Sequence, residues 1–439
     1  MFDISGRKVT IVGGKRSGMA LAKLVVRQKG NAKVSEHGPE DSLSLEFKTW
    51  AKQNGVSLEF NAHTQSFIED SDMVVLSPGV RFDAPPVQWA KAKGILILGE
   101  IEFAYQFCRK PVIAVTGSNG KTTTVNLIAN VLREAGYGAC LCGNVGTPFS
   151  QSVLDLADVD YVLLEISSFQ LESLVHPKSP FRRSQNKNLQ VQGFKPFIGI
   201  ILNFSQNHLD RHKDLQEYLD AKKNLFLNQG PNEYALLNDQ SSYLRDIAKD
   251  LKSQVIFFND SKSSLLGDIK NPNHMAVMAA ARILGIKSNI CRKIFLEFKG
   301  VEHRLELVRS LDGVDFINDS KATTAEAGRW ALSNIDKPIL MICGGKDKNI
   351  DFSVLRNIVK EKVKKMFVIG EAKAKLHQTF EGCVAIEECD NLEKAVSGAR
   401  IAAHRGDCVL LTPMCASFDM FRDYEHRGKA YKDIVKALA

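Results

Sequence analysis

The sequence lacks any apolar run long enough to cross a membrane. A membrane helix needs about 20 consecutive apolar residues. The longest runs here have only the length of a strand, and they are Val112–Val115, Tyr161–Leu164, Phe197–Leu202 and Ile339–Cys343. The apolar block of a signal peptide is also missing before the strand that begins at Lys8. We therefore expect a cytoplasmic protein without membrane insertion.

Closely spaced cysteine pairs are almost missing, although the chain has nine cysteines. Only Cys140 and Cys142 lie near each other, and a Cys-x-Cys pair alone is neither a zinc ribbon nor a redox motif. We expect reduced and mostly packed thiols, as is usual in cytosolic proteins.

The composition also lacks the extremes that mark special classes of protein. Of 439 residues, 44% are hydrophobic, 25% are charged and 8% are aromatic, while glycine and proline are unremarkable. These values exclude disorder, a collagen helix or a coiled coil as a description of the whole chain. At about 150 residues per domain, the length predicts about three domains.

Acidic residues are absent from one stretch, His176–Pro196, although the net charge of the chain is only +8. Its positive residues are Lys178, Arg182, Arg183, Lys187 and Lys195. Because the stretch is also rich in proline, glycine, serine, asparagine and glutamine, we expect a solvated surface loop. The stretch could instead contact nucleic acid or an anionic surface. The rest of the chain is near charge balance, so the net charge says little about partners, and we expect no nucleic-acid partner.

Short apolar strands alternate with helical segments along almost the whole chain, which predicts an α/β protein built on parallel sheets. Three blocks are expected, at residues 1–99, 100–300 and 301–439. The first and third are Rossmann-like, and the central block is a parallel-sheet domain like that of P-loop ATPases. The expected strands include Lys8–Val12, Met73–Leu76, Val112–Val115, Tyr161–Ile166, Val314–Asn318, Ile339–Cys343, Met366–Ile369 and Cys408–Leu411.

The strongest motif is Val115–Thr124, in which a strand enters a glycine-rich turn and then a helical pattern over Val125–Arg133. Glycines let backbone N–H groups surround phosphate oxygens, and the dipole of the following helix favours their charge. A lysine there would neutralise the β- and γ-phosphates, and a threonine hydroxyl could bind Mg²⁺. The strict phosphate-loop motif has a glycine where Val115 stands. The predicted ATP-binding residues are Gly117, Ser118, Asn119, Gly120, Lys121, Thr122 and Thr123.

Polar residues follow two further strands of the central block. Glu165 closes an apolar strand, which is where α/β enzymes place metal and phosphate ligands. Beside a phosphate loop, this carboxylate is a candidate ligand for Mg²⁺. His208 and Asp210 follow another strand and could supply a second cation site or orient phosphates.

Three polar loops of the third block also follow strands, at Asn318–Lys321, Gly344–Lys348 and Thr412–Asp419. Because the carboxyl ends of parallel strands meet at one edge of a sheet, these loops predict one binding face. The residues that would suit an anionic substrate are Lys346, Lys348 and Ser417.

The first block opens with Gly13–Gly18 and has Glu36 after the next strand, which resembles a dinucleotide-binding pattern. A glycine-rich loop alone is a weak signal, and the helix that follows could bind any diphosphate. We therefore interpret the two nucleotide-type loops as sites for ATP and for a nucleotide-linked substrate. Arg304, at the entry to the third block, could reach back to a nucleotide.

Together these motifs resemble the Mur ligase family, ATP-dependent ligases that add amino acids in peptidoglycan synthesis. The general marks of the family are Thr116–Thr123 and Asn203–Asp210. The marks of the members that add D-glutamate are Leu164–Glu172, Asn318–Thr323, Leu411–Phe421 and Arg422–Gly428. The resemblance covers essentially the whole chain.

The resemblance implies a UDP-substrate-binding domain at 1–99, an ATP-binding domain at 100–300 and an amino-acid-binding domain at 301–439. It implies that ATP activates the carboxylate of UDP-N-acetylmuramoyl-L-alanine as an acyl phosphate. D-Glutamate then forms the amide, with release of phosphate. Two Mg²⁺ sites are expected.

The resemblance also implies a role for individual residues. The catalytic residues would be Lys121, His208 and Lys222. The metal ligands would be Thr122, Glu165, His208 and Lys222, the last as a carbamate formed with CO₂. The adenine nucleotide would contact Asn271, Arg304 and Asp319. The UDP-substrate would contact Arg16, Ser17, Glu36, His37, Ser77 and Asn144. D-Glutamate would contact Thr323, Lys348, Ser417, Phe418 and Tyr424. Composition alone does not distinguish Lys222 from Lys223.

Three features depart from the family pattern. The His-Asn-x-x-Asn element reads Lys270–His274 here, so His274 replaces the second asparagine. The Gly-x-Gly start reads Gly13-Gly-Lys, which adds a charge near the expected diphosphate. The basic stretch His176–Pro196 has no family role.

Four other interpretations compete with this one. Folylpolyglutamate synthase also joins glutamate to a carboxylate with ATP, but it lacks a full N-terminal UDP domain. The chain could also be another Mur ligase, one that adds a different amino acid. A regulatory protein that binds ATP or GTP without ligation leaves the polar loops of the third block unexplained. An inactive relative is disfavoured by the presence of Lys121, Glu165, His208 and Lys222.

Overall fold

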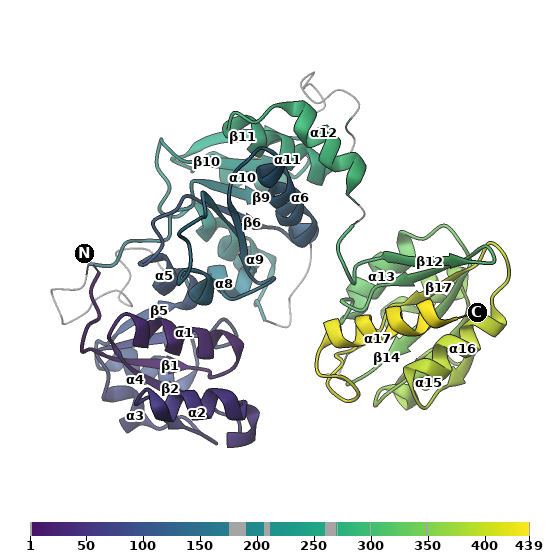
Figure 1. The fold of residues 1–439 in the computed structure, drawn as a ribbon, viewed down its shortest axis with the longest axis horizontal. Helices are drawn as coiled ribbons and strands as arrows, with labels where there is room; N and C mark the ends of the chain where they lie inside the picture. The colour runs from purple at the N-terminus through teal and green to yellow at the C-terminus, as the bar shows by residue number, and fades with distance from the viewer. Residues whose placement is uncertain are drawn as a thin grey trace. The chain divides into compact units, whose positions relative to one another are not determined.

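The computed structural model describes residues 2–174, 190–205, 211–259, 269, 271–298, 300–347 and 350–438. The chain divides into two compact units, Met1–Phe298 and Lys299–Ala439. Strands alternate with helices along both units (Figure 1). The predicted α/β class is therefore confirmed.

The first sheet, drawn in purple in Figure 1, has five parallel strands in the order β3-β2-β1-β4-β5. The strands are β1 (Lys8–Val12), β2 (Asn31–Ser35), β3 (Ser57–Glu59), β4 (Met73–Leu76) and β5 (Leu96–Gly99). The helices are α1 (Arg16–Arg27), α2 (Leu45–Gln53), α3 (Gln65–Glu69), α4 (Pro85–Ala92) and α5 (Glu100–Tyr105). This strand order is the Rossmann-like order that the sequence predicts.

The second sheet has six parallel strands in the order β11-β10-β9-β6-β8-β7. The strands are β6 (Val112–Thr116), β7 (Ala139–Gly143), β8 (Tyr161–Glu165), β9 (Ile198–Ile201), β10 (Tyr234–Asn238) and β11 (Gln254–Phe258). Its helices are α6 (Lys121–Glu134), α7 (Phe149–Ser152), α8 (Ser168–Glu172), α9 (Leu215–Lys223), α10 (Ser242–Ala248), α11 (Pro272–Ile283) and α12 (Ser288–Glu297). The helix expected at 125–133 is thus confirmed as part of α6.

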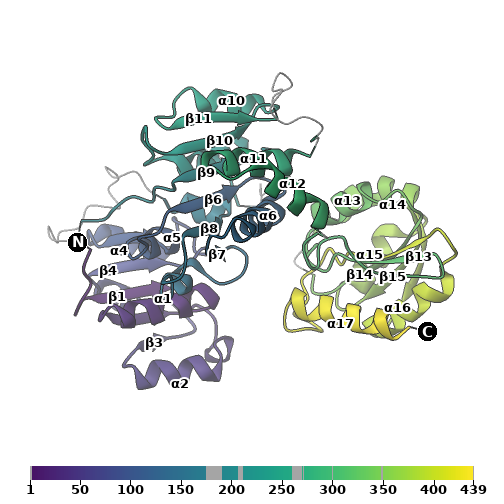
Figure 2. The same ribbon diagram turned by 45° about the horizontal axis from the view of Figure 1, so that its top comes forward.

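Helices cover both faces of this second sheet. Apolar side chains of α6, α11 and α12 pack together with alternate strand residues, such as Val115 and Ile200. The other strand residues, such as Ala114 and Leu164, pack with Leu171 of α8 and residues of α9 and α10. Figure 2 shows α6, α11 and α12 grouped together. Burial on both faces explains why the strands are continuously apolar.

The sheet of the second unit has the order β12-β13-β17-β14-β15-β16 and is mixed. The strands are β12 (Glu306–Leu311), β13 (Val314–Asn318), β14 (Ile339–Gly344), β15 (Val363–Ile369), β16 (Ala385–Glu388) and β17 (Cys408–Leu411). The helices are α13 (Ala325–Ser333), α14 (Arg356–Lys362), α15 (Lys373–Phe380), α16 (Leu392–Ala402) and α17 (Tyr424–Ala437).

The antiparallel strand β12 was not predicted. It forms a hairpin with β13 through Asp312 and Gly313, whose φ angles are +52° and +80°. Two consecutive residues with positive φ are typical of the Asp-Gly turn that joins hairpin strands. The other strands of this sheet are parallel, as expected.

The prediction for the basic stretch His176–Pro196 is wrong for its last residues. Residues 175–189 lie outside the described part of the chain. Phe194, however, is fully buried, and its ring packs edge-on against Tyr105 at 5.2 Å between centroids. Lys195 pairs with Glu233 at 2.9 Å. This end of the stretch is therefore part of the core, because an aromatic side chain gains more from burial than from exposure.

The nine cysteines are all free, and seven of them are buried. The prediction that most of the thiols are packed is confirmed. Within the described ranges, every helix is too short or too polar to span a bilayer. The domain boundaries at 99 and 300 remain a prediction.

Candidate active site

The phosphate loop connects β6 to α6 and has the conformation that its glycines permit. Gly117 and Gly120 have φ angles of +151° and +81°, which other residues rarely adopt. The helix α6 begins at Lys121, directly after the loop. The ammonium group of Lys121 donates to the carbonyls of Gly117 and Ser118 at 2.7 and 3.1 Å. The lysine thus lies over the loop, where phosphate oxygens would replace these carbonyls.

Asn203, at the end of β9, holds the loop in place. Its side-chain oxygen accepts a hydrogen bond from the N–H of Asn119 at 2.8 Å, and its amide donates back to the Asn119 carbonyl at 3.1 Å. Its carbonyl also accepts from the N–H of Ser118. The sequence pattern placed Asn203 at a strand end, but it did not predict this supporting role.

Glu165 ends β8, directly beside β6, with Val115 as its register partner. Its side chain is 1% exposed. One carboxylate oxygen accepts a hydrogen bond from the side chain of Asn144 at 2.7 Å. The other oxygen is buried and has no hydrogen-bond partner among the described residues. A buried carboxylate oxygen without a partner is costly unless a cation or another donor binds it.

Lys222 lies on α9 and reaches the same end of β6. Its side chain is 1% exposed, and its ammonium lies 3.5 Å from the hydroxyl of Thr116 and 4.4 Å from the ring centre of Tyr218. Burial, together with the nearby charge of Lys121, holds the pKa of Lys222 well below its usual range. Lys223, in contrast, pairs with Asp250 at 2.8 Å at the surface. Packing therefore distinguishes the two adjacent lysines.

His208 and Asp210 lie outside the described residues. Arg211, the next described residue, contacts α8 and the loop after β4. Arg211 pairs with Glu172 at 3.2 Å and donates to the carbonyls of Gly79 and Val80. The predicted roles of His208 therefore remain predictions.

The UDP-substrate residues predicted in the first sheet lie around the start of α1. The hydroxyl of Ser77 donates to the carbonyl of Gly13 at 2.6 Å. Both oxygens of Glu36 accept backbone N–H groups, from Gly14 at 2.6 Å and Gly38 at 2.9 Å. Glu36 therefore shapes the loop rather than leaving its carboxylate free. In a dinucleotide site, that carboxylate would be needed for a ribose hydroxyl.

The loop after β7 connects two of these predicted residues, Arg16 and Asn144. Arg16, at the start of α1, donates to the carbonyl of Gly146 in this loop. Asn144, in the same loop, donates from its side-chain amide to Glu165. Ser17 follows Arg16 on α1, and His37 is exposed beside His63 at 5.7 Å between ring centres. Through this loop, the start of α1 is therefore connected to the carboxylate beside the phosphate loop.

The start of α11 corrects our interpretation of Lys270–His274. The ring of His274 stacks on Phe295 at 4.1 Å between centroids, so it is a packing residue. Asn271 caps α11, because its side-chain oxygen accepts the N–H of Asn273 at 2.9 Å. Asn273 itself lies against the phosphate loop: a Cβ added to Gly120 would be 2.6 Å from its side-chain oxygen. Asn273 was not among the site residues predicted from the sequence.

In the second unit, Asp319 is buried at the end of β13. One of its oxygens accepts the N–H of Leu305, and the other accepts the hydroxyl of Thr412, both at 3.2 Å. Burial raises the pKa of Asp319 from 3.8 to about 7, although the nearby Arg304 opposes this shift. Arg304 is exposed beside it. Thr412 was not among the predicted site residues.

The polar loops of the second unit follow the neighbouring strands β13, β17 and β14, as the sequence predicts. Arg427 of α17 is buried and connects two of these loops. It donates to the hydroxyl of Ser320 at 3.0 Å and to the carbonyl of Cys415 at 3.2 Å. The hydroxyl of Ser320 donates to the carbonyl of Tyr424 at 2.8 Å. The role of Arg427 as a scaffold residue was not predicted from the sequence.

The residues predicted to bind D-glutamate differ in exposure. Ser417 is buried, Thr323 and Tyr424 are partly buried, and Phe418 is 63% exposed. Lys348 lies outside the described residues. The ammonium of Lys321 lies 5.3 Å from the ring centre of Tyr424, which brings a positive charge to this face. A positive charge on this face suits an anionic ligand.

Two domain families match the chain. Residues 115–291 match the Mur ligase middle domain. Residues 303–415 match the family described as Mur ligase, glutamate ligase domain. The first range begins within β6 and contains the phosphate loop and the other strands of the second sheet. The second range contains all six strands of the sheet of the second unit.

Full-length relatives carry one enzyme name. The UDP-N-acetylmuramoylalanine–D-glutamate ligase of Koribacter versatilis (strain Ellin345) is 37% identical over 100% of this chain and 99% of its own length. The enzyme of the same name from Pelotomaculum thermopropionicum (strain DSM 13744 / JCM 10971 / SI) is 35% identical over 99% of both chains.

A solved structure shares the fold at low identity. The MurF ligase from Thermotoga maritima in complex with ADP has a TM-score of 0.55 and 14% identity, over 93% of this chain and 96% of its own. The domain matches, the full-length identity to the two ligases and this shared fold agree. The chain belongs to the Mur ligase family, and it is an ATP-dependent ligase that forms amide bonds.

Proposed function

We propose that the chain joins D-glutamate to the carboxylate of UDP-N-acetylmuramoyl-L-alanine in peptidoglycan synthesis, with conversion of ATP to ADP and phosphate. The observation that carries the proposal is the set of charged groups at the ends of β6 and β8, of which Glu165 and Lys222 are buried. Lys121, Glu165 and Lys222 converge there beside the phosphate loop. The choice of substrates rests on the names of the full-length relatives. The reaction belongs in the cytoplasm, where we expect the chain.

The chemistry follows from the weakness of a carboxylate as an acylating agent. The substrate carboxylate attacks the γ-phosphate of ATP and forms an acyl phosphate, and ADP leaves. The amine of D-glutamate then attacks the acyl carbon, the amide forms, and phosphate leaves. Lys121 and the N–H groups of the loop stabilise the charge on the transferred phosphoryl group. Lys121 would exchange its bonds to the Gly117 and Ser118 carbonyls for phosphate oxygens.

The same groups fit Mg²⁺. Glu165 has a buried oxygen without a partner among the described residues, and the Thr122 side chain is buried at the start of α6. Because its pKa is lowered, Lys222 has the neutral amine that reacts with CO₂ to give a carbamate. The proposed ligands are Thr122, Glu165, His208 and Lys222 as a carbamate. Divalent cations bound there would spread the negative charge of phosphoryl transfer.

We assign the remaining predicted residues to the three substrates. Arg16, Ser17, Glu36, His37, Ser77 and Asn144 serve the UDP-substrate. Asn271, Arg304 and Asp319 serve the adenine nucleotide. Thr323, Lys348, Ser417, Phe418 and Tyr424 serve D-glutamate. The domains at 1–99, 100–300 and 301–439 hold the UDP-substrate, ATP and the amino acid.

The direct test is phosphate release by the purified chain with ATP, Mg²⁺ and UDP-N-acetylmuramoyl-L-alanine. The amine is varied among D-glutamate, L-glutamate, L-alanine, glycine and diaminopimelate. We expect release only when the UDP-substrate and D-glutamate are both present. Release with another amine would contradict the assigned amino acid. A rate of ATP hydrolysis that depends on neither substrate would favour a regulatory nucleotide-binding protein.

The phosphate loop can be tested separately. Lys121→Ala is expected to lower turnover at least about 1,000-fold, because the lysine charge acts on the transferred phosphoryl group. Binding of the UDP-substrate, measured by calorimetry, should stay within about twofold of the parent value, since that site is built by other residues. Loss of both properties together would contradict separate sites.

A further inference from the structure

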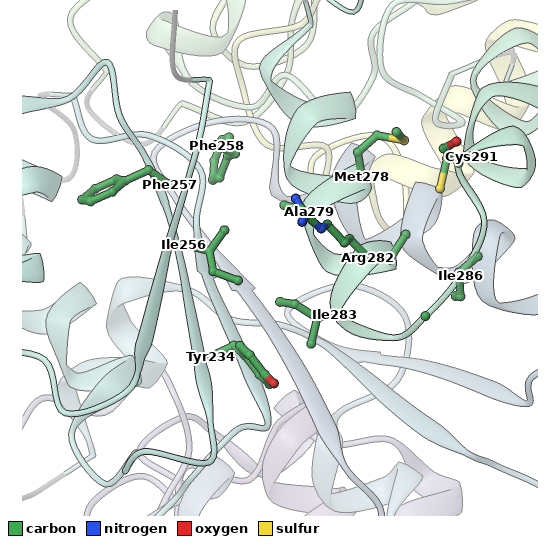
Figure 3. A pocket seen from close by; sticks show the side chains of 13 residues that line it. Tyr234, Ile256, Phe257, Phe258, Met278, Ala279, Arg282, Ile283, Ile286 and Cys291 are labelled. Atoms are coloured by element: carbon green, nitrogen blue, oxygen red, sulfur yellow. The ribbon is translucent and has the colours of Figure 1, made fainter. Parts of the chain in front are cut away.

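A cavity of about 830 Å³ lies between the edge of the second sheet and the helices α11 and α12. Its walls come from β10 and β11 on one side and from α11 and the start of α12 on the other (Figure 3). The helix side of the wall includes Ala279, Ala281 and Gly285. Such small side chains do not fill the space between a helix and a sheet, so a cavity remains.

The wall of this cavity is mainly apolar. Figure 3 shows Ile283 reaching from α11 toward Ile256 and Tyr234 on the strands. Phe258 and Met278 also contribute to the wall. Ligand sites typically have volumes of about 300–1,000 Å³ and apolar walls with a few polar groups. The volume of this cavity and its mainly apolar wall are therefore typical of a ligand site.

Among the residues that the structure describes, Arg282 is the one charged residue that lines the cavity. Its side chain is exposed and extends from α11 toward the strands (Figure 3). Its guanidinium has no hydrogen bond or ion pair within the described part of the chain, unlike Lys223 or Lys293, which pair with carboxylates. A guanidinium beside an apolar wall attracts a ligand that combines an apolar body with a carboxylate or sulfonate.

The cavity is separate from the phosphate loop. Asn273, at the start of α11, lies against Gly120 of that loop. The cavity is lined by the second half of the helix, from Met278 to Ile283. The described part of the lining contains no residue that we assign to ATP, the UDP-substrate or D-glutamate. A ligand could therefore occupy the cavity while the nucleotide is bound.

We propose that this cavity is a binding site for an amphiphilic organic anion. Its apolar rings or chain lie between α11 and the strands β10 and β11, and its anionic group pairs with Arg282. The apolar body supplies affinity through loss of water from its surface, and Arg282 supplies the preference for negative charge.

The test uses two fluorescent probes with the same skeleton on the full chain, with MgADP in excess. The anionic probe is 8-anilino-1-naphthalenesulfonate, and the neutral probe is N-phenyl-1-naphthylamine. Ala279→Phe, which fills the cavity, should weaken binding of both probes at least about tenfold. Arg282→Gln should weaken the anionic probe at least about tenfold and leave the neutral probe within about twofold. Arg292→Gln removes the same charge from α12 outside the lining and should leave both affinities within about twofold.

Phosphate release by each variant shows that it is folded. The proposal is overturned if Ala279→Phe keeps the parent affinity for both probes, or if Arg282→Gln weakens neither. Displacement of the anionic probe by MgADP would place it in the nucleotide site and would also overturn the proposal. If Ala279→Phe does not fold, the affinities of the two probes for Arg282→Gln still test the proposal.

Discussion

Two adjacent lysines on α9 show how much the environment of one side chain decides. Lys222 is buried beside Thr116, whereas Lys223 pairs with Asp250 at the surface. We expect Lys222→Ala to lower phosphate release at least about 100-fold, as loss of a metal-site group does. Lys223→Ala is the matched control and should stay within about twofold, since exposed ion pairs contribute little. Equal losses in both variants would contradict the assignment of Lys222.

A second prediction at the scale of a single residue concerns Asp319 and the pH dependence of stability. Its pKa is about 7 in the folded chain and 3.8 in the reference state, because burial disfavours the carboxylate. The folded state therefore binds an additional proton between these two values. The contribution of Asp319 to the free energy of unfolding therefore falls as pH rises between these two pKa values, and it is constant at higher pH.

The side chain of Asn in the Asp319→Asn variant does not bind this proton. The free energy of unfolding of the variant should therefore lack this part of the pH dependence. Relative to the parent chain, the variant is expected to gain melting temperature as pH increases from about 5 to 8. Calorimetric scans of both proteins across this range measure the difference. Parallel curves for the two proteins would show that Asp319 does not titrate as proposed.

At the scale of single elements, two glycines at opposite ends of α6 offer a matched comparison. Gly120 precedes the helix and Gly136 follows it, and both have positive φ, +81° and +86°. Alanine at either position costs about 1–2 kcal/mol of backbone strain. A Cβ at Gly120 would also lie 2.6 Å from the Asn273 side chain, whereas a Cβ at Gly136 meets nothing within 4 Å.

Gly120→Ala is therefore expected to weaken ATP binding at least about tenfold, because the phosphate loop must shift. Gly136→Ala should lose a similar amount of stability and keep its ATP affinity. Nucleotide titration and thermal melts of the two variants separate the effects. A similar loss of affinity in both variants would mean that general strain, not the loop, is responsible.

The elements also show which local patterns can be read from the sequence. The segment from Val115 to Arg133 was predicted correctly as strand, loop and helix, because its apolar run, glycines and helix formers are all local signals. The hairpin at Asp312–Gly313 was missed, although its turn residues carry a local signal. The short edge strands β3 and β16 have partly exposed residues and so lack a clear apolar pattern.

At the scale of the whole molecule, each compact unit has its own hydrophobic core. The clusters of the first unit contain residues such as Leu164 and Val115, and those of the second contain residues such as Met341 and Phe316. Units with separate cores unfold separately. We expect calorimetry of the full chain to resolve two transitions, and Asp319→Asn to shift only one of them. A single transition that the variant shifts as a whole would contradict independent unfolding.

The amino-acid order alone was enough to predict the α/β class, the phosphate loop and the family, because these depend on residue types at short, regular spacings. Tertiary packing decided which groups lose contact with water. Nothing local distinguishes Lys222 from Lys223, and nothing local shows that one oxygen of Glu165 is buried without a partner among the described residues. The cavity beside Arg282 likewise exists only where α11 meets β10 and β11. Burial depends on segments far apart in the chain, and burial determines pKa, cation affinity and the space for ligands.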